Sequence, residues 1–189
     1  VAILPNSVLV VVGDGVEREA IEAKTRELGL QENVHMLGMR HDVPEILAAI
    51  DLKVLSSKME ANPASTLEAS ACGLPVVVPN VGSLAETVED GKTGLLCRPD
   101  DPAALADAMV QVLSDPIAAR AMGRAGRDLV CRRFSVEAMV RGYERLVEGV
   151  YRAACQGSRL TPRQFDRIMD IELEGIASEQ ADSPQLAVN

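Results

Sequence analysis

Two glutamates, Glu60 and Glu68, lie eight positions apart in a segment that runs from a loop through a predicted helix start toward a buried strand. The vicinal hydroxyls of a ribose or hexose each donate one hydrogen bond, and a carboxylate offers two acceptor oxygens, so one glutamate can hold one sugar ring. Between them, Ala64, Ser65 and Thr66 fall at the helix N-terminus, where free backbone N–H groups and the helix dipole favour a diphosphate. The spacing therefore predicts a site for a sugar nucleotide.

Taken singly, each glutamate has a simpler interpretation. Glu68 can be a first-turn acid that stabilises its own helix through the helix dipole. Glu60 can be a solvated loop residue. Only the residues around the pair can distinguish a binding site from these two simpler interpretations.

Other chemistries find less support in the sequence. Gly13–Gly15 follows a predicted strand, but Arg18 stands where a dinucleotide-binding turn needs its third glycine, so a tight turn explains the glycines and NAD or FAD is not expected. His35 and His41 have no partner at helical spacing and no Asp-x-Asp pair occurs, so no metal site is expected. His35 is interpreted as a partly buried strand residue. The absence of a Gly-x-Ser-x-Gly elbow or a Cys/His pairing argues against hydrolase chemistry.

Composition narrows the possible partners and compartment. The 189 residues carry a net charge of -9, with 2% aromatic residues and no Trp, so neither phosphate-backbone binding nor base stacking is supported and nucleic acid is not an expected partner. The four scattered cysteines are expected to be buried free thiols in a reducing compartment. No long apolar run or leader occurs, so we expect a soluble, cytoplasmic protein.

Short β-branched runs alternate with helical patterns over the first hundred residues, as in a parallel α/β sheet. We expect strands at 8–12, 33–37, 52–56, 75–78 and 94–97, and helices at 17–28, 43–50, 64–72 and 84–88. Gly29, Gly73 and Gly91 stand where these helices should end, as C-terminal caps do. In such sheets, ligands bind beyond the carboxyl ends of the strands.

From Asp101 onward the pattern is helical only, with helices expected at 102–113, from 116, and from the residue after Ser135 to about 151. A further helix is expected to open at Thr161, with an apolar face made of Phe165, Ile168, Met169, Leu173 and Ile176. The last dozen residues have the composition of a disordered end. We therefore divide the chain into a Rossmann-like domain at 1–155 and a helical, partly disordered tail at 156–189.

Glu60 and Glu68, followed by Ala-Ser-Ala-Cys-Gly-Leu-Pro-Val-Val-Val-Pro (69–79), resemble the nucleotide-sugar site of the retaining glycosyltransferases of family 4, also called group 1. Other stretches fall in that family's order: VVVGDG (10–15), VHMLG (34–38), DVPEIL (42–47), GSLAETVEDGKTGLL (82–96) and DPAALA (101–106). The resemblance covers about residues 7–151. It implies one half of the GT-B fold, a parallel Rossmann-like sheet with helices on both faces and C-terminal helices.

The resemblance also implies an activity, namely transfer of a hexose from a nucleoside-diphosphate sugar to an acceptor with retention and without a metal or other cofactor. Glu60 would contact the transferred sugar near the reacting carbon and is the expected catalytic residue. Glu68 would bind the ribose hydroxyls. The remaining donor contacts would come from the amides of Ala64 and Ser65 and the hydroxyl of Thr66 at the distal phosphate, and from Met39 and Arg40 at the nucleobase.

The chain departs from the family's pattern in two respects. Ala61–Pro63 replaces the usual glycine and aromatic residue after the first glutamate, and Pro63 cannot donate a backbone hydrogen bond. The family's first strand, a loop with an arginine and a lysine for the diphosphate, and the N-terminal acceptor domain would all precede Val1. Lys58 and Arg40 could replace part of that positive charge. The chain is thus expected to be a donor-binding half that is inactive alone, and peripheral membrane association through the acceptor domain fits the lipid acceptors of the family.

Two other functions stay open. One is a module that binds a nucleotide sugar without transferring it, for which the altered loop and the missing cations are the motive. The other keeps the fold but changes the reaction to that of an epimerase or a phosphorylase. The second has less support, because no cofactor lysine or epimerase-type histidine was found.

Overall fold

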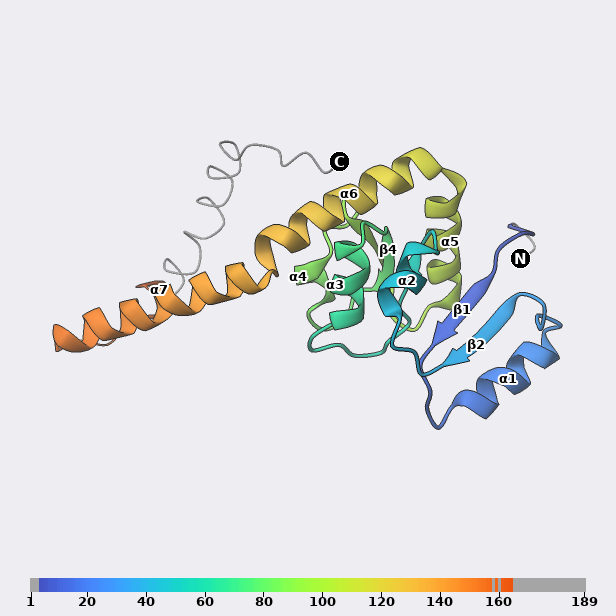
Figure 1. The fold of residues 1–189 in the computed structure, drawn as a ribbon, viewed down its shortest axis with the longest axis horizontal. Helices are drawn as coiled ribbons and strands as arrows, with labels where there is room; N and C mark the ends of the chain where they lie inside the picture. The colour runs from blue at the N-terminus through green and yellow to red at the C-terminus, as the bar shows by residue number, and fades with distance from the viewer. Residues whose placement is uncertain (1–3, 158, 160, 165–189) are drawn as a thin grey trace.

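The structure, a computed structural model, describes residues 4–157, 159 and 161–164 and has an α/β fold in which every pairing between its strands is parallel (Figure 1). The strands are β1 (Leu9–Val12), β2 (Val34–Gly38), β3 (Lys53–Val54), β4 (Val76–Pro79) and β5 (Gly94–Cys97). The helices are α1 (Arg18–Glu27), α2 (Val43–Ala48), α3 (Ala64–Ala71), α4 (Leu84–Thr87), α5 (Pro102–Ser114), α6 (Pro116–Arg133) and α7 (Val136–Cys155). The fold class and each element expected between residues 8 and 151 are confirmed.

The strands form two sheets rather than the single sheet that the sequence predicted. β1 pairs with β2, while β4 lies between β3 and β5 in a separate three-stranded sheet. β3 is only two residues long where five were expected, and no pairing joins it to β1 among the described strands. In Figure 1 the β1–β2 pair and α1 lie to one side of the remaining elements. The expected strand upstream of Val1 stays a prediction.

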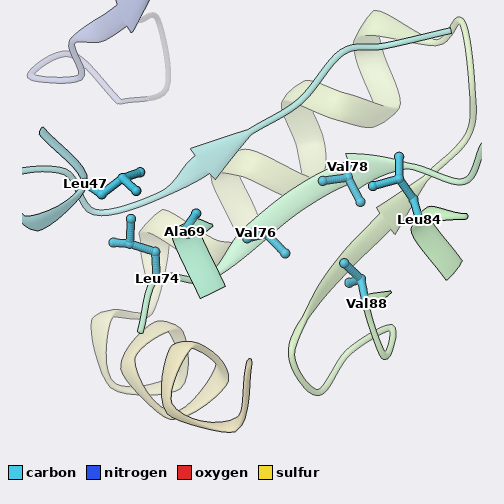
Figure 2. Close-up of a cluster of buried hydrophobic side chains, with 7 residues drawn as sticks. All are labelled: Leu47, Ala69, Leu74, Val76, Val78, Leu84 and Val88. Carbon is cyan, nitrogen blue, oxygen red and sulfur yellow. The ribbon is translucent and has the colours of Figure 1, made fainter. Parts of the chain in front are cut away.

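Helices cover both faces of the three-stranded sheet because β4 is apolar on both sides. Val76 and Val78 pack into a cluster with residues of α2, α3 and α4, shown in Figure 2. Val77 points to the other face, where it packs with residues of α5 and α6. All four residues of β4 are buried, as expected for the central strand of a parallel sheet.

Helix starts and ends follow the local signals in most places. Asp101, Asp115 and Ser135 accept hydrogen bonds from the first-turn amides of α5, α6 and α7, as N-caps do. Gly29 and Gly73 directly follow the C-caps of α1 and α3 with φ of +65° and +78°, so both predictions are confirmed. Gly91 is not a helix cap, because α4 ends at Thr87 and Gly91 lies in the turn that leads into β5.

Several expectations about burial were wrong. All four cysteines are free, but only Cys97 is buried, while Cys72, Cys131 and Cys155 are exposed. His35 is also exposed rather than partly buried, because successive residues of β2 alternate between half-buried and exposed and His35 lies on the exposed side. Within the described residues, no helix is long and apolar enough to cross a membrane. The tail helix expected after Thr161 falls mostly on residues 165–189, which lie outside the described part of the chain.

Candidate functional site

Glu60 lies in the loop that leads from β3 to α3, at the carboxyl end of the three-stranded sheet. The loop that follows β4 meets it there. The Ser83 amide donates a hydrogen bond to the Glu60 carbonyl oxygen (3.1 Å), and the Ser83 hydroxyl donates to the carbonyl oxygen of Ala61 (2.9 Å). The two loops thus meet where parallel α/β sheets bind their ligands.

Glu68 lies on α3, in the second turn rather than the first. The helix begins at Ala64 and has no acidic residue in its first turn. The side chain of Glu68 is exposed, whereas the neighbouring Ala69 is fully buried in the core. The interpretation of Glu68 as a first-turn acid is therefore wrong, and the favourable dipole interaction that it supposed falls off beyond the first turn.

The amides at the start of α3 are only partly free. The Ala64 amide donates to the carbonyl oxygen of Asn62 (2.9 Å), and the Thr66 amide donates to that of Pro63 (2.9 Å). The Ser65 amide has no hydrogen-bond acceptor among the described residues. No side chain caps this helix, whose N-cap residue is Pro63. Of the two amides predicted to hold a phosphate, Ser65 has a free N–H and Ala64 does not.

The hydroxyl of Thr66 lies beneath the helix start rather than on its open surface. Thr66 is only 1% exposed, and its hydroxyl oxygen is buried without a hydrogen-bond partner in the described part of the chain. A buried, unpaired hydroxyl costs about 1–3 kcal/mol, so such groups in folded proteins usually have a role or a partner. A phosphate bound at this helix start could pair with the Thr66 hydroxyl. The atoms that bury Thr66 would first have to move.

Met39 and Arg40 follow β2, which belongs to the other sheet. Met39 is 71% exposed. The guanidinium of Arg40 donates two hydrogen bonds to the Asp42 carboxylate, one of them from Nε at 2.7 Å, and this carboxylate raises the pKa of Arg40. In the described residues, no hydrogen bond or ion pair connects either residue to the loop of Glu60 or to α3. Their place beside the nucleobase therefore stays a prediction.

Arg40 and Lys58, which the sequence offered as cations for the donor diphosphate, already have acidic partners. Arg40 pairs with Asp42, and the Lys58 ammonium lies 3.6 Å from the Asp100 carboxylate. A donor diphosphate would have to compete with these carboxylates. Both pairs are exposed to solvent, where an ion pair contributes at most about 1 kcal/mol, so the competition is not prohibitive.

Lys53 is a third cation that the sequence analysis missed. It lies on β3, in register with Val76 of β4, and is half-buried. Burial lowers the pKa of its ammonium, while the charges of Glu68 and Glu60 oppose this shift. The charges of both glutamates therefore act on the Lys53 ammonium. A lysine within the apolar run Leu52–Leu55 was the signal that could have identified it.

We expect Lys53→Met to raise the free energy of unfolding at neutral pH, because methionine has no charge to desolvate. The pKa of Lys53 in the folded chain lies below the ordinary value of 10.5. The unfolded chain consequently binds more protons between these two values, and the stability of the unsubstituted chain rises with pH there. The gain from Lys53→Met should thus shrink as pH approaches 10.5. Urea unfolding at neutral and alkaline pH measures this gain in the free energy of unfolding. The control is Lys24→Met, because Lys24 is exposed. A gain that does not change with pH would contradict a lowered pKa for Lys53.

The turn between β1 and α1 was predicted to need two glycines, and one of them is required. Gly13 has φ of +121°, and its amide donates to the carbonyl oxygen of Gly38 at the end of β2 (2.8 Å). Gly15 does not have a positive φ, and a side chain added there would meet open space.

Among the described residues, no group of three or more His, Cys, Asp or Glu side chains is placed to hold a metal ion.

A comparison with known families and structures gives a consistent match. A family model described as glycosyl transferases group 1 matches residues 2–129. The N-acetyl-alpha-D-glucosaminyl L-malate synthase of Bacillus anthracis is 37% identical over 144 residues, which are 76% of this chain and 38% of that protein.

Among solved structures, Anabaena HepE in complex with UDP is 27% identical with a TM-score of 0.73, over 76% of this chain and 41% of that chain. HepE in complex with UDP-glucose is 30% identical with a TM-score of 0.67, over 70% of this chain and 38% of that chain. The present chain spans well under half of the length of these relatives.

Proposed function

The chain belongs to the group 1 glycosyltransferases, and on that basis we propose that it is the donor-binding half of a hexosyltransferase that uses a nucleoside-diphosphate sugar. The observation that carries this proposal is the arrangement of Glu60, Glu68 and the start of α3 at the carboxyl end of the sheet. The similarity to a protein solved with UDP and with UDP-glucose supports it. The acceptor domain would lie in the longer protein, as the lengths of the relatives suggest.

Each residue then has a role that follows from its position. The carboxylate of Glu68, which is exposed, accepts hydrogen bonds from the ribose hydroxyls, and the carboxylate of Glu60, which is half-buried, accepts them from hydroxyls of the transferred sugar. The free amide of Ser65 donates to the diphosphate, supported by the helix dipole. The Ala64 amide and the Thr66 hydroxyl join only if the donor rearranges the helix start. Met39 and Arg40 pack against the nucleobase after Arg40 leaves Asp42.

The transfer proceeds with retention and without a metal ion. The bond between the anomeric carbon and the diphosphate oxygen breaks, and the acceptor hydroxyl oxygen bonds to the same face of that carbon while its proton passes to the departing diphosphate. Fixed dipoles and cations stabilise the charge that develops on the diphosphate. Because part of this positive charge and the acceptor-binding domain would lie elsewhere in the longer protein, the chain alone binds the donor without turnover. We place the protein in the reducing cytoplasm, with membrane association through its acceptor domain.

A second candidate is a module that binds the sugar nucleotide and never transfers it. Two observations favour it: Arg40 and Lys58 are both engaged by carboxylates, and Ala61–Pro63 replaces the usual loop after the first glutamate. In the complete protein, binding without turnover would support the module over the transferase. The epimerase and phosphorylase alternatives have no residue in their favour.

Calorimetric titration of the chain with UDP, GDP and ADP tests the proposal directly. We expect at least one of the three nucleotides to bind, because Glu68 and the start of α3 contact the ribose and diphosphate that all three share. The preferred base then identifies the donor class. If none of the three binds, the assignment of a donor site to this chain is wrong.

A further inference from the structure

The backbone of Glu60 is held by the loop that follows β4. Ser83 donates to two consecutive carbonyl oxygens, from its amide to Glu60 (3.1 Å) and from its hydroxyl to Ala61 (2.9 Å). These two hydrogen bonds fix the orientations of two consecutive peptide units, the one that joins Glu60 to Ala61 and the one that joins Ala61 to Asn62. The side chain of Glu60 therefore extends from a backbone whose direction is set by another loop.

Gly82 makes this approach possible. Its φ is +53°, in the left-handed region that favours glycine. A Cβ atom added at Gly82 would overlap the carbonyl oxygen of Glu60, and it would lie 2.8 Å from the carbonyl carbon and 3.1 Å from the nitrogen of the same residue. All three are backbone atoms, so no side-chain rotation can relieve the overlap. Any larger residue must therefore move the backbone of Glu60 and the backbone of residue 82 apart.

The far end of the same loop is fixed as well. The Asn62 carbonyl oxygen accepts from the Ala64 amide (2.9 Å), and Pro63 is buried at the start of α3. The backbone of residues 60–63 is thus held at both ends of the loop. The contacts from Gly82 and Ser83 hold the end of this loop that carries Glu60.

We propose that Gly82 and Ser83 are positioning residues for Glu60, and that they act on the sugar part of the donor and not on its nucleotide. This inference rests on the proposed function, since it assumes that Glu60 contacts the transferred sugar. The nucleotide is held by Glu68 and the start of α3, which Gly82 and Ser83 do not contact through any hydrogen bond in the described residues. A displaced Glu60 loses its sugar contacts, because displacements of about 1 Å are enough to disrupt a binding or catalytic geometry.

The test compares UDP and UDP-glucose binding by calorimetry in Gly82→Ala and in a matched control, Gly91→Ala. Both glycines lie between β4 and β5 with positive φ, +53° and +73°, but an added Cβ at Gly91 meets nothing within 4 Å. In Gly82→Ala we expect UDP affinity to be retained and the additional affinity for UDP-glucose to fall by about tenfold, the scale of one hydrogen bond to a charged group. Gly91→Ala should keep both affinities.

Ser83 supplies a second variant that introduces no steric overlap. Ser83→Ala should also reduce the additional affinity for UDP-glucose, and Ser83→Thr, which keeps the hydroxyl, should restore it. A purely structural role would instead lower the melting temperature and leave the ratio of the two affinities unchanged. An unchanged ratio in both Gly82→Ala and Ser83→Ala would overturn the proposal.

Hydrogen exchange of the peptide that spans 57–67 tests, without any ligand, whether Gly82 positions the loop that carries Glu60. Gly82→Ala should accelerate exchange in this peptide and Gly91→Ala should not. If the unsubstituted chain binds none of UDP, GDP and ADP, the proposed function fails, and the exchange data alone determine whether Gly82 positions the loop. Equal exchange in the two variants would show that it does not.

Discussion

Replacing Glu68 with glutamine should lower the affinity of the chain for its nucleotide by roughly 10- to 100-fold, the range expected for hydrogen bonds to a charged group. Glutamine has nearly the same shape, but it offers one acceptor oxygen and no charge to two ribose hydroxyls that both donate. Because the Glu68 side chain is exposed and lies beyond the first turn of α3, we expect the free energy of unfolding to change by less than about 0.5 kcal/mol. Calorimetry with the preferred nucleotide and thermal unfolding measure the two quantities.

Glu19→Gln is the control, since Glu19 is another exposed helical glutamate but lies on α1, outside the site. It should leave nucleotide affinity unchanged. In the complete protein, Glu68→Ala should abolish turnover without unfolding the chain. Unaltered nucleotide affinity in Glu68→Gln, or turnover at the unsubstituted rate in Glu68→Ala, would remove the role assigned to this residue.

Local signals in the sequence were sufficient to place the elements that carry the site. The run Val76–Val78 predicted a buried strand, and β4 is buried at every position. Asp101, Asp115 and Ser135 predicted three helix starts, and each of them accepts the expected hydrogen bonds. These features depend on residues close together in the chain, which is why they could be predicted from the sequence.

Contacts that depend on the exact path of a loop could not be predicted, whether the two partners are close together or far apart in the chain. The spacing of Ala64 and Ser65 indicated two free amides, but the turn formed by Asn62 occupies one of them. The positive charges of Arg40 and Lys58 were visible in the sequence, whereas their partners, two and forty-two positions away, were not. The approach of Gly82 to Glu60 depends on two loops that meet only in the folded chain.

The packing of α6 against α3 connects the stability of the fold to the site, because α3 carries Glu68. Gly123 of α6 lies against the turn that ends α3. A Cβ added there would overlap the carbonyl oxygen of Gly73 and lie 2.8 Å from its carbonyl carbon. One turn later, the guanidinium of Arg127 donates to the carbonyl oxygen of Ala71 (2.7 Å). The two helices are thus in direct backbone contact at this point.

We expect Gly123→Ala to destabilise the chain by on the order of 3 kcal/mol, because the overlap is with backbone and α6 must move away from the end of α3. Gly126→Ala, on the same helix, is the matched control. Its added Cβ would lie 3.4 Å or more from any neighbour, so the helix preference of alanine over glycine, up to about 1 kcal/mol, should leave it as stable as the unsubstituted chain or slightly more so. Urea unfolding followed by circular dichroism compares the three proteins. Equal stability of the two variants would mean that α6 does not dock on α3 through Gly123. The separation predicted for them would show instead that the helix bearing Glu68 is held in place by backbone contact with α6.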